Sequence, residues 1–346
     1  MQTITIGDRR IGPDEPIFIA VETGVTCNGD VDTALRVIDA AARAGADAVK
    51  FMIIGADHFM SDRNVTYEYE WAGGQNAENM YEMFKGLEFT RDQWERIRDH
   101  CHERGLVFYA TVDYLPGVDL AEELGVPAYK LSSWDTANLP LIKKMAHTGK
   151  PLQVDTGPTT LADIDKLLTF VQAHGDSDVV LVHCSHAKTD CGQNLRSIPH
   201  LNAVFGVPVG YSADSRDEVP DLLAVALGAR LLEKRVTLDK AYKGHHHIKA
   251  LEPDEFAAWV ATVRRAEALL GRDGVFPSAE DLRQKEMYFV SLVAEGDIPA
   301  GTVIREEMVR CKRPGTGIAP EYAPLVIGRT AQRDIAHNQL MAWNDI

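Results

Sequence analysis

Two lysines stand inside apolar, strand-like runs of this chain: Lys50 in AVKF (48–51) and Lys130 in AYKL (128–131). An ammonium group that leaves water without a partner is costly, so each run would otherwise bury an unpaired charge. We therefore interpret both lysines as candidate ligands of a phosphate or carboxylate, although a lone lysine at a strand end is usually a solvated charge.

Glu22 is an acid at the end of the run IFIAVE (17–22). A carboxylate in this place could hydrogen-bond a substrate or steer a proton. The alternative is an ion pair with Lys50 or Lys234 in the interior of the protein.

Three consecutive histidines occur in KGHHH (243–247). Imidazole is a common metal ligand and proton carrier, whereas the alternative is an exposed loop. Because side chains alternate along an extended segment, we expect His245 and His247 to face away from His246.

Eight short apolar runs alternate with amphipathic helical stretches from Pro16 to about Gly271. The predicted strands are 17–22, 47–52, 106–111, 128–132, 151–155, 178–183, 207–212 and 230–236, and helical spacing is found at 31–44, 90–104, 139–147, 161–174 and 253–270. Strands that are apolar on both faces and separated by helices indicate a parallel sheet covered by helices, and eight such units favour a closed (β/α)8 TIM barrel. An open doubly wound sheet is the alternative, but no GxGxxG follows the first strand.

The rest of the chain divides into a long excursion and a second domain. Residues 52–90 are polar and aromatic without a sustained period, which predicts either a substrate-binding loop at the carboxyl side of the barrel or a surface insertion. We place the barrel domain at 1–276, a charged linker at 277–287 and a small β-rich domain at 288–346. So small a domain buries little core by itself, and we expect it to dock on a barrel mouth.

Composition excludes several classes of protein. With 36 Lys and Arg against 51 Asp and Glu, the net charge of −15 argues against a nucleic-acid partner. No run approaches the roughly 20 apolar residues of a membrane span, and MQTITIGDRR does not resemble a signal peptide. The five cysteines are scattered without metal spacing and are typical of reduced thiols, so we expect a cytoplasmic protein without a membrane partner.

Nine ordered motifs together resemble the N-acylneuraminate (sialic acid) synthase family. They are AVETGVTCNGD (20–30), AGADAVKF (44–51), YKLSSWD (129–135), VDTGP (154–158), LVHCS (181–185), VGYSADS (209–215), AVALGARLLEKRVTLD (224–239), LEPDEF (251–256) and DIPAGTVI with KRPGTGI (297–318). The resemblance implies a phosphoenolpyruvate-condensing TIM barrel followed by an antifreeze-like domain of the SAF type. It also implies a swapped homodimer in which this domain caps the active site of the other subunit.

In that family, carbon 3 of phosphoenolpyruvate adds to the aldehyde of an N-acylmannosamine, water attacks carbon 2, and phosphate leaves to give an ulosonic 2-keto acid. The resemblance implies phosphoenolpyruvate contacts for five residues: Lys50, Lys130, Ser133, Ser212 and Arg313. It further implies a catalytic role for Glu22 toward the sugar. Asp135 stands where the family usually has a substrate-contacting glutamate.

The sequence departs from the family at its metal site and at several contacts. Two histidines hold the metal in the family, and those positions carry Asp214 and Arg235 here; His246 replaces an acid that handles the sugar. Other altered positions are Met52, Asp155, His186 and Lys188. So many changes predict a changed acceptor, a changed mechanism, or both.

Two interpretations of the metal site compete. In the favoured one no metal is required: Arg235 supplies a fixed cation near the aldehyde oxygen, and Asp214 holds it by an ion pair. In the other, Asp214, His246 and His183, with His245 or Asp155 as a further ligand, form a mixed set for a divalent metal such as Mn, Mg or Zn. Arginine itself cannot be a ligand, because its guanidinium stays protonated.

Asp155 raises a separate question about the donor. An acceptor-only carboxylate would repel phosphoenolpyruvate unless His186 or Lys188 neutralises it; otherwise the donor could be pyruvate or another enol. Two rival functions follow from the departures. One is a lyase or aldolase that uses Lys130, Lys188 or Lys234 as a Schiff-base amine. The other is a non-catalytic ligand-binding protein that kept the fold.

Overall fold

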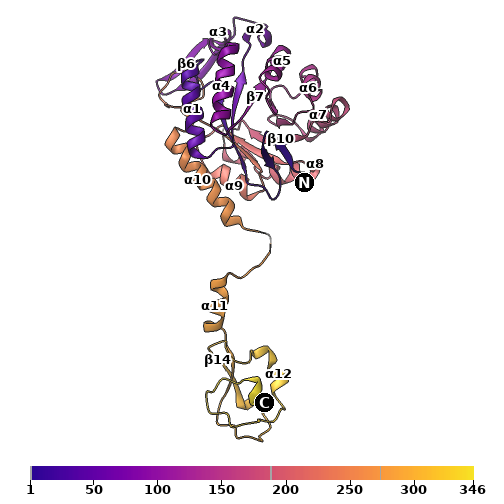
Figure 1. The fold of residues 1–346 in the computed structure, drawn as a ribbon, viewed down its shortest axis with the longest axis vertical. Helices are drawn as coiled ribbons and strands as arrows, with labels where there is room; N and C mark the ends of the chain where they lie inside the picture. The colour runs from indigo at the N-terminus through magenta and orange to yellow at the C-terminus, as the bar shows by residue number, and fades with distance from the viewer. Residues whose placement is uncertain (1, 188, 273) are drawn as a thin grey trace. The chain divides into compact units, whose positions relative to one another are not determined.

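The computed structural model describes residues 2–187, 189–272 and 274–346, and the chain forms two compact units, Met1–Gly271 and Arg272–Ile346. The first unit contains a closed barrel of eight strands in which every neighbouring pair is parallel (Figure 1). In order around the barrel the strands are β3 (Phe18–Gly24), β4 (Ala48–Ile53), β7 (Val107–Val112), β8 (Tyr129–Leu131), β9 (Leu152–Asp155), β10 (Val179–Ser185), β11 (Val209–Ala213) and β12 (Leu231–Arg235). Each lies on one of the eight predicted runs, so the predicted TIM barrel is confirmed.

Helices cover the outside of this barrel (Figure 1). They are α1 (Val31–Ala44), α4 (Arg91–Glu103), α5 (Leu115–Glu123), α6 (Leu139–Ala146), α7 (Leu161–His174), α8 (Ser197–Phe205), α9 (Val219–Ala226) and α10 (Pro253–Leu270). In α1 the Asp30 side chain caps the first turn by accepting from the Asp32 amide, and Gly45 ends the helix with a φ of 81°. Local caps of this kind fix helix ends, whereas the buried apolar face against the strands supplies most of the stability.

An N-terminal hairpin closes the amino end of the barrel. Strands β1 (Ile4–Ile6) and β2 (Arg9–Ile11) pair antiparallel, and their isoleucines are buried in one cluster with Phe18, Tyr109 and other inward residues of the barrel strands. This apolar plug occupies the end where the strands begin. The carboxyl ends are left to carry polar residues, as in other TIM barrels.

The long excursion after β4 has regular structure of its own. It contains α2 (Ala56–Phe59), an antiparallel hairpin of β5 (Thr66–Trp71) and β6 (Gly74–Asn79), and α3 (Met80–Lys85). Asp57 holds the two short helices together, because it accepts hydrogen bonds from Tyr81 Oη at 2.7 Å and Lys85 Nζ at 2.8 Å. The long excursion, which we expected to be a substrate-binding loop or a surface insertion, therefore contains two short helices and a hairpin.

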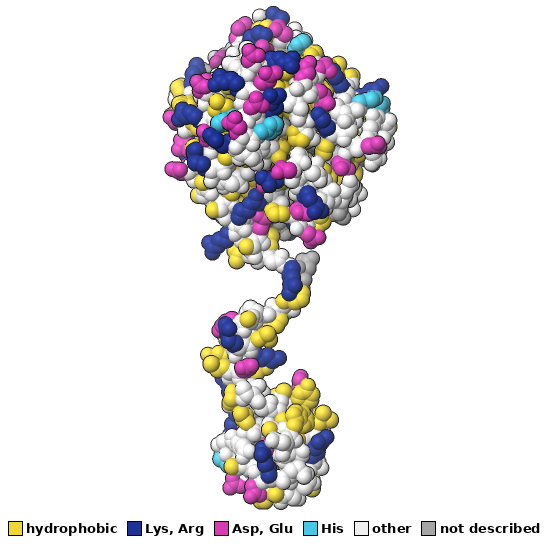
Figure 2. All heavy atoms as spheres, viewed as in Figure 1, with side chains coloured by type: hydrophobic (Ala, Val, Ile, Leu, Met, Phe, Trp, Pro, Cys, Tyr) yellow, Lys and Arg dark blue, Asp and Glu magenta, His cyan; other side chains and the backbone are white. Residues whose placement is uncertain are grey.

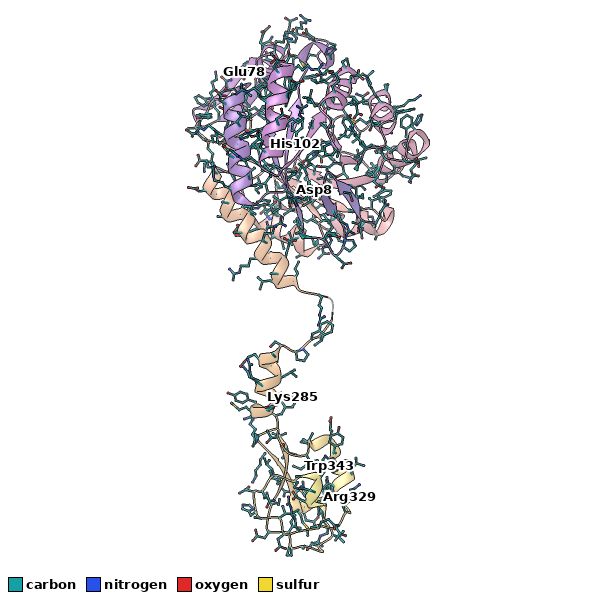
Figure 3. All side chains as sticks on the ribbon, viewed as in Figure 1. Asp8, Glu78, His102, Lys285, Arg329 and Trp343 are labelled. Carbon is teal, nitrogen blue, oxygen red and sulfur yellow. The ribbon has the colours of Figure 1, made fainter. Side chains whose placement is uncertain are left out.

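The second unit is a small β-containing fold. Helix α11 (Ala279–Tyr288) occupies most of 277–287, where we expected a linker. It is followed by the antiparallel strands β13 (Ser291–Ala294) and β14 (Val309–Lys312) and by α12 (Ala323–Val326). A compact core of nine buried apolar residues holds the unit together, and Trp343 packs edge to face on Tyr322 near its end (Figure 3).

Two surface properties bear on partners. Over the described ranges, the helices are all too short or too polar to cross a bilayer. Figure 2 shows Lys and Arg side chains interspersed with Asp and Glu over the visible face of the barrel unit. This mixed pattern differs from the clustered basic stripe that nucleic-acid binding requires.

Candidate active site

The carboxyl ends of five barrel strands bring five charged side chains to the floor of a cavity of about 360 Å³: Glu22, Lys50, Lys130, Asp155 and Glu233. Lys50 pairs with Glu22 and, at 3.2 Å, with Glu233 Oε1. Lys130 Nζ lies 2.6 Å from Glu233 Oε2 and 2.8 Å from Asp155 Oδ1. Glu233 thus bridges the two lysines, and the five groups form one continuous chain of alternating charge.

Neutral side chains fix the bridging glutamate from below. Gln153 Nε2 donates to Glu233 Oε1 at 2.8 Å, and Tyr109 Oη donates to Gln153 Oε1 at 2.7 Å. Burial tends to raise the pKa of Glu233, but the charges of Lys130 and Lys50 outweigh it and hold that pKa well below its usual range. Burial tends to lower the pKa of Lys130, yet Asp155 and Glu233 raise it overall. The amine of Lys130 is therefore protonated and positioned for an anion.

The anionic form of Asp155 is less strongly stabilised by neighbouring cations than that of Glu233. Burial raises its pKa to about 6, although Lys130 acts in the opposite direction. We expected His186 or Lys188 to neutralise Asp155, but the cation beside it is Lys130; Lys188 lies outside the described residues. His186 instead contacts Ser133 Oγ at 3.3 Å and stacks on the ring of Trp134.

Asp214 and Arg235 form the expected ion pair at the rim of the cavity, with Arg235 Nη1 donating to Asp214 Oδ1. Lys249 Nζ donates to the other oxygen, Oδ2. Burial tends to raise the pKa of Asp214, but the charge of Arg235 and the bond from Lys249 bring it below its ordinary value. One carboxylate between two cations leaves this part of the rim with a net positive charge.

The histidine segment does not run extended, so our expectation was wrong for His245, whereas His247 does face away from His246. His246 has a φ of 80°, in the left-handed region, and this turn brings His245 and His246 to the same cavity with ring centroids 3.5 Å apart. His247 turns into the core, where its ring contacts Thr237 Oγ1 at 2.7 Å and Asn28 Oδ1 at 3.1 Å. Burial, followed by the charge of Arg235, lowers the pKa of His245 to about 4 and that of His246 well below its ordinary value.

Gly24 lies where three catalytic candidates come together, and a side chain at this position would crowd them. A Cβ atom at this position would lie 3.1 Å from Glu22 Oε1, 3.5 Å from His246 Nδ1 and 3.9 Å from Arg235 Nε, and the φ of Gly24 is 49°. Among the residues that the structure describes, Arg235 Nε and His246 Nδ1 are buried polar atoms without a hydrogen-bond partner. Buried polar groups are usually paired, so these two nitrogen atoms are candidates to bind an oxygen atom of a substrate.

The hairpin of β5 and β6 extends the site outward. Tyr67 Oη lies 2.8 Å from His245 Nε2, and its ring lines the central cavity. A second cavity of about 650 Å³ is lined by Glu68, Tyr69 and Glu70 of β5. The two cavities share His186, Asp214, His245 and His246. The central cavity therefore continues into a polar space that could hold a longer substrate.

Some predicted site residues join the cavity and others do not. Ser133 and Ser212 line it, and the Cα of Gly157 packs so closely on Ser133 that a Cβ there would lie 2.3 Å from the serine Cβ. Asp135 does not line it; its Oδ1 accepts a hydrogen bond from Asn138 Nδ2 at 2.9 Å, and its carboxylate lies close to that of Asp113. Arg313 belongs to the second unit, where its Nε donates to the carbonyl oxygen of Tyr288 at 2.7 Å.

Two of the alternative metal ligands, Asp214 and His183, are engaged by other groups of the protein. Within the described part of the chain, no three side chains of His, Cys, Asp or Glu converge as a metal-binding group. Both oxygens of Asp214 are engaged by cations, so a metal ion would have to displace Arg235 and Lys249. His183 does not join Asp214, because its Nε2 contacts the carbonyl oxygen of Gln193 at 2.7 Å.

Comparisons with known proteins agree with this architecture. The NeuB family profile matches residues 37–274, which is more than half of the chain, and the SAF domain profile matches 289–346. The chain belongs to the NeuB family. This NeuB-family chain is 32% identical to the N,N'-diacetyllegionaminic acid synthase of Campylobacter jejuni, over 94% of the chain and 98% of that protein.

Two further relatives match over most of their length. The uncharacterised protein MJ1065 of Methanocaldococcus jannaschii is 32% identical over 100% of this NeuB-family chain and 99% of its own. The sialic acid synthetase of Leptospira borgpetersenii, solved in complex with citrate, superposes with a TM-score of 0.73 at 28% identity, over 82% of the chain and 95% of that structure.

Sequence reasoning missed Glu233, Gln153 and Tyr67. A signal for Glu233 was present, because LLEKR is a buried strand in which Glu233 and Arg235 must share one face and Lys234 the other. Lys234 indeed points outward, where its Nζ lies 2.6 Å from Asp221 Oδ2. Tyr67 gave no signal, since only the hairpin fold carries it to the cavity.

Proposed function

We propose that this NeuB-family protein condenses phosphoenolpyruvate with the aldehyde of a sugar-like acceptor, giving an ulosonic 2-keto acid and phosphate. The observation that carries the proposal is the pair of buried, charged lysines, Lys50 and Lys130, bridged by Glu233 beneath a cavity at the barrel mouth. The name of the C. jejuni relative, a synthase of diacetyllegionaminic acid, supports the same class of product.

The donor lies over the two lysines. Lys50, Lys130, Ser133 and Ser212 line one cavity, and ammonium and hydroxyl groups are suited to the oxygens of a phosphate and a carboxylate. Fixed positive charges of this kind hold the reacting carbon in place and cost no reorganisation during the reaction. Asp135 contacts substrate only after it moves toward the cavity, which it does not line.

The acceptor aldehyde points toward Arg235, and the reaction requires no metal. When carbon 3 of the donor attacks, negative charge develops on the aldehyde oxygen, and the unpartnered Arg235 Nε stabilises it. Asp214 is a positioning residue, because it holds the guanidinium by its outer nitrogen. Glu22 and His246 flank the same space and hydrogen-bond the sugar or guide the proton that the new hydroxyl gains.

The acceptor differs from N-acetylmannosamine. Met52 and His246 line the cavity at positions where the resemblance implies a glutamine and an acid, and Tyr67 adds an aromatic wall. The adjoining cavity beside β5 offers room for further substituents. Lys188, outside the described residues, is a further proposed acceptor contact.

The second unit caps the barrel of a partner chain in a homodimer, and Arg313 reaches the donor there. Four apolar side chains in the N-terminal segment of this unit are exposed, and such a group favours contact with another protein surface. They are Leu282, Met287, Tyr288 and Phe289. The five cysteines carry no disulfide among the described residues, which supports a cytoplasmic location.

A Schiff-base lyase has less support. The amine of Lys130 is held protonated by two carboxylates and is therefore a poor nucleophile. Lys234 faces the helices outside the barrel and lies over Trp259. A non-catalytic binding protein would have no need for the unpartnered polar atoms that the described residues Arg235 and His246 present.

The test is phosphate release from phosphoenolpyruvate with a panel of aldoses and N-acylhexosamines, after chelation and again with Mn or Mg restored. We expect aldehyde-dependent release that survives chelation. Release only with metal would overturn the role of Arg235 but leave the condensation standing. No release with any aldehyde, together with borohydride trapping of a keto acid, would establish the lyase instead.

A further inference from the structure

We infer that Asp155 takes up a proton when the donor binds, so that this carboxyl group acts as a neutral hydrogen-bond donor to the phosphate. The inference rests on the proposed function. Asp155 ends β9, is only 8% exposed, and lines the same cavity as Lys50 and Ser133. The side chain is thus in reach of any anion that the two lysines hold.

The charges on the floor of the cavity do not balance a trianion. Three carboxylates, Glu22, Asp155 and Glu233, face two ammonium groups, Lys50 and Lys130, which gives a net charge of −1 when all are ionised. Phosphoenolpyruvate adds about three negative charges near neutral pH, because its phosphate loses a second proton at about pH 6. One proton brings the net charge of the floor from −1 to 0, which reduces its repulsion of the trianion, and turns an acceptor into a donor.

Asp155 is the acid that can accept this proton. Glu233 has both lysines and Gln153 as partners, and Glu22 pairs with Lys50. Among the described residues, the one cation that forms an ion pair with Asp155 is Lys130, which Asp155 shares with Glu233. Because burial already raises its pKa to about 6, a nearby phosphate needs to shift this acid only a little further.

Titratable groups from five other barrel strands surround Asp155. They are Lys130 from β8, Lys50 from β4, Glu233 from β12, Tyr109 from β7 and the Cys184 thiol from β10, with His186 lining the same wall. Burial raises the pKa of Cys184 to about 12 and that of Tyr109 well above its usual value, so both stay neutral. Asp155 is therefore the acid on the floor of the cavity whose protonation state can change near neutral pH.

The sign of the pH effect follows. Below pH 6 Asp155 is already protonated and donor binding costs nothing extra. Above pH 6 each pH unit costs about tenfold in affinity, up to about 100-fold at pH 8, because the proton must be taken from solution. Asp155→Asn removes this cost, since the amide is neutral at every pH.

Isothermal titration calorimetry of the full-length protein with phosphoenolpyruvate, at pH 8 in Tris and in Hepes, counts the protons taken up. We expect the wild type to take up about one proton more than Asp155→Asn, and the variant to bind more tightly by 10- to 100-fold at pH 8. Titration of the donor's own phosphate cancels in this comparison. Asp155→Asn should fold, because Lys130 keeps its 2.6 Å contact with Glu233.

Asp113→Asn is the matched control. Burial also raises the pKa of Asp113, but this acid does not line the cavity, so its replacement should leave proton uptake unchanged. Equal uptake by wild type and Asp155→Asn, or weaker binding by the variant at pH 8, would overturn the inference alone. Absence of phosphoenolpyruvate binding by the wild type from pH 5.5 to 8.5 would overturn the proposed donor with it.

Discussion

Arg235 and Asp214 form an ion pair between the ends of the adjacent strands β12 and β11, with the second carboxylate oxygen of Asp214 taken by Lys249. This arrangement leaves Arg235 Nε unpartnered among the described residues and close to Glu22 and His246. A charged group held in this way is preorganised to stabilise negative charge in the transition state, because its orientation is set before substrate binds.

Arg235→Ala should lower the rate of aldehyde-dependent phosphate release by about 10²- to 10³-fold, the usual effect of removing one preorganised donor. Donor affinity should change far less, because the lysines lie deeper in the cavity. Added guanidinium should restore part of the rate of Arg235→Ala. Arg235→Lys keeps the positive charge but lacks the planar guanidinium group, and added guanidinium should not raise its rate. Recovery of Arg235→Ala by Mn instead of guanidinium would contradict the role that we propose.

Glu233→Gln should destabilise the barrel unit by about 3–5 kcal/mol, because the two buried lysines lose their shared counter-ion. Urea unfolding followed by the fluorescence of the buried Trp94 and Trp259 measures this change. Glu95→Gln is the control: its pair with Arg91 is exposed and should contribute no more than about 1 kcal/mol. If the free energy of unfolding falls by a similar amount in both variants, the buried charge network around Glu233 stabilises the protein no more than an exposed ion pair does.

Asp113 should make the protein less stable as pH rises. Burial, followed by the charge of Asp135, raises its pKa to about 7, so the folded state prefers the protonated acid. The free energy of unfolding should therefore fall by about 2–4 kcal/mol between pH 4 and pH 7 on account of this group. Asp113→Asn should abolish that fall and be more stable than the wild type at pH 8. An unchanged pH profile in thermal unfolding would refute the assignment.

Tyr67→Phe should raise the KM for the acceptor by about 2- to 10-fold, the usual effect of one lost hydrogen bond, with donor affinity unchanged. The reason is that Tyr67 fixes the ring of His245 at the wall of the cavity. Tyr114→Phe is a suitable control, because its hydroxyl makes only a long contact of 3.5 Å to the carbonyl oxygen of Ile54. A loss of affinity for phosphoenolpyruvate in Tyr67→Phe would contradict this prediction, because it would show that the β5–β6 hairpin acts on the donor and not on the acceptor.

Mixing Arg313→Ala chains with Lys50→Met chains tests the proposed exchange of domains. Each parent should be nearly inactive, and co-expressed mixtures should regain activity above both, because one of the two mixed sites carries both Lys50 and Arg313. Phosphate release in the mixture, compared with the separate parents, gives the answer. Activity no higher than that of the parents would mean that Arg313 serves its own chain or no site at all.

Much of the barrel and its floor followed from the sequence alone. The eight apolar runs predicted the strands, because a parallel strand buried on both faces must be apolar throughout. Lys50 and Lys130 stood out for the same reason: a charge in such a run needs a partner or an anion. The strand alternation in LLEKR also contained the information that Glu233 and Arg235 share a face.

Only the tertiary structure decided which groups meet. Lys130, not His186, compensates Asp155, since strand register around a closed barrel sets that contact and no local pattern encodes it. The left-handed turn at His246 placed His245 in the cavity, which simple alternation excluded. Local residue patterns fix which segments are strands and helices, whereas distances between side chains far apart in the chain depend on how all the elements close together.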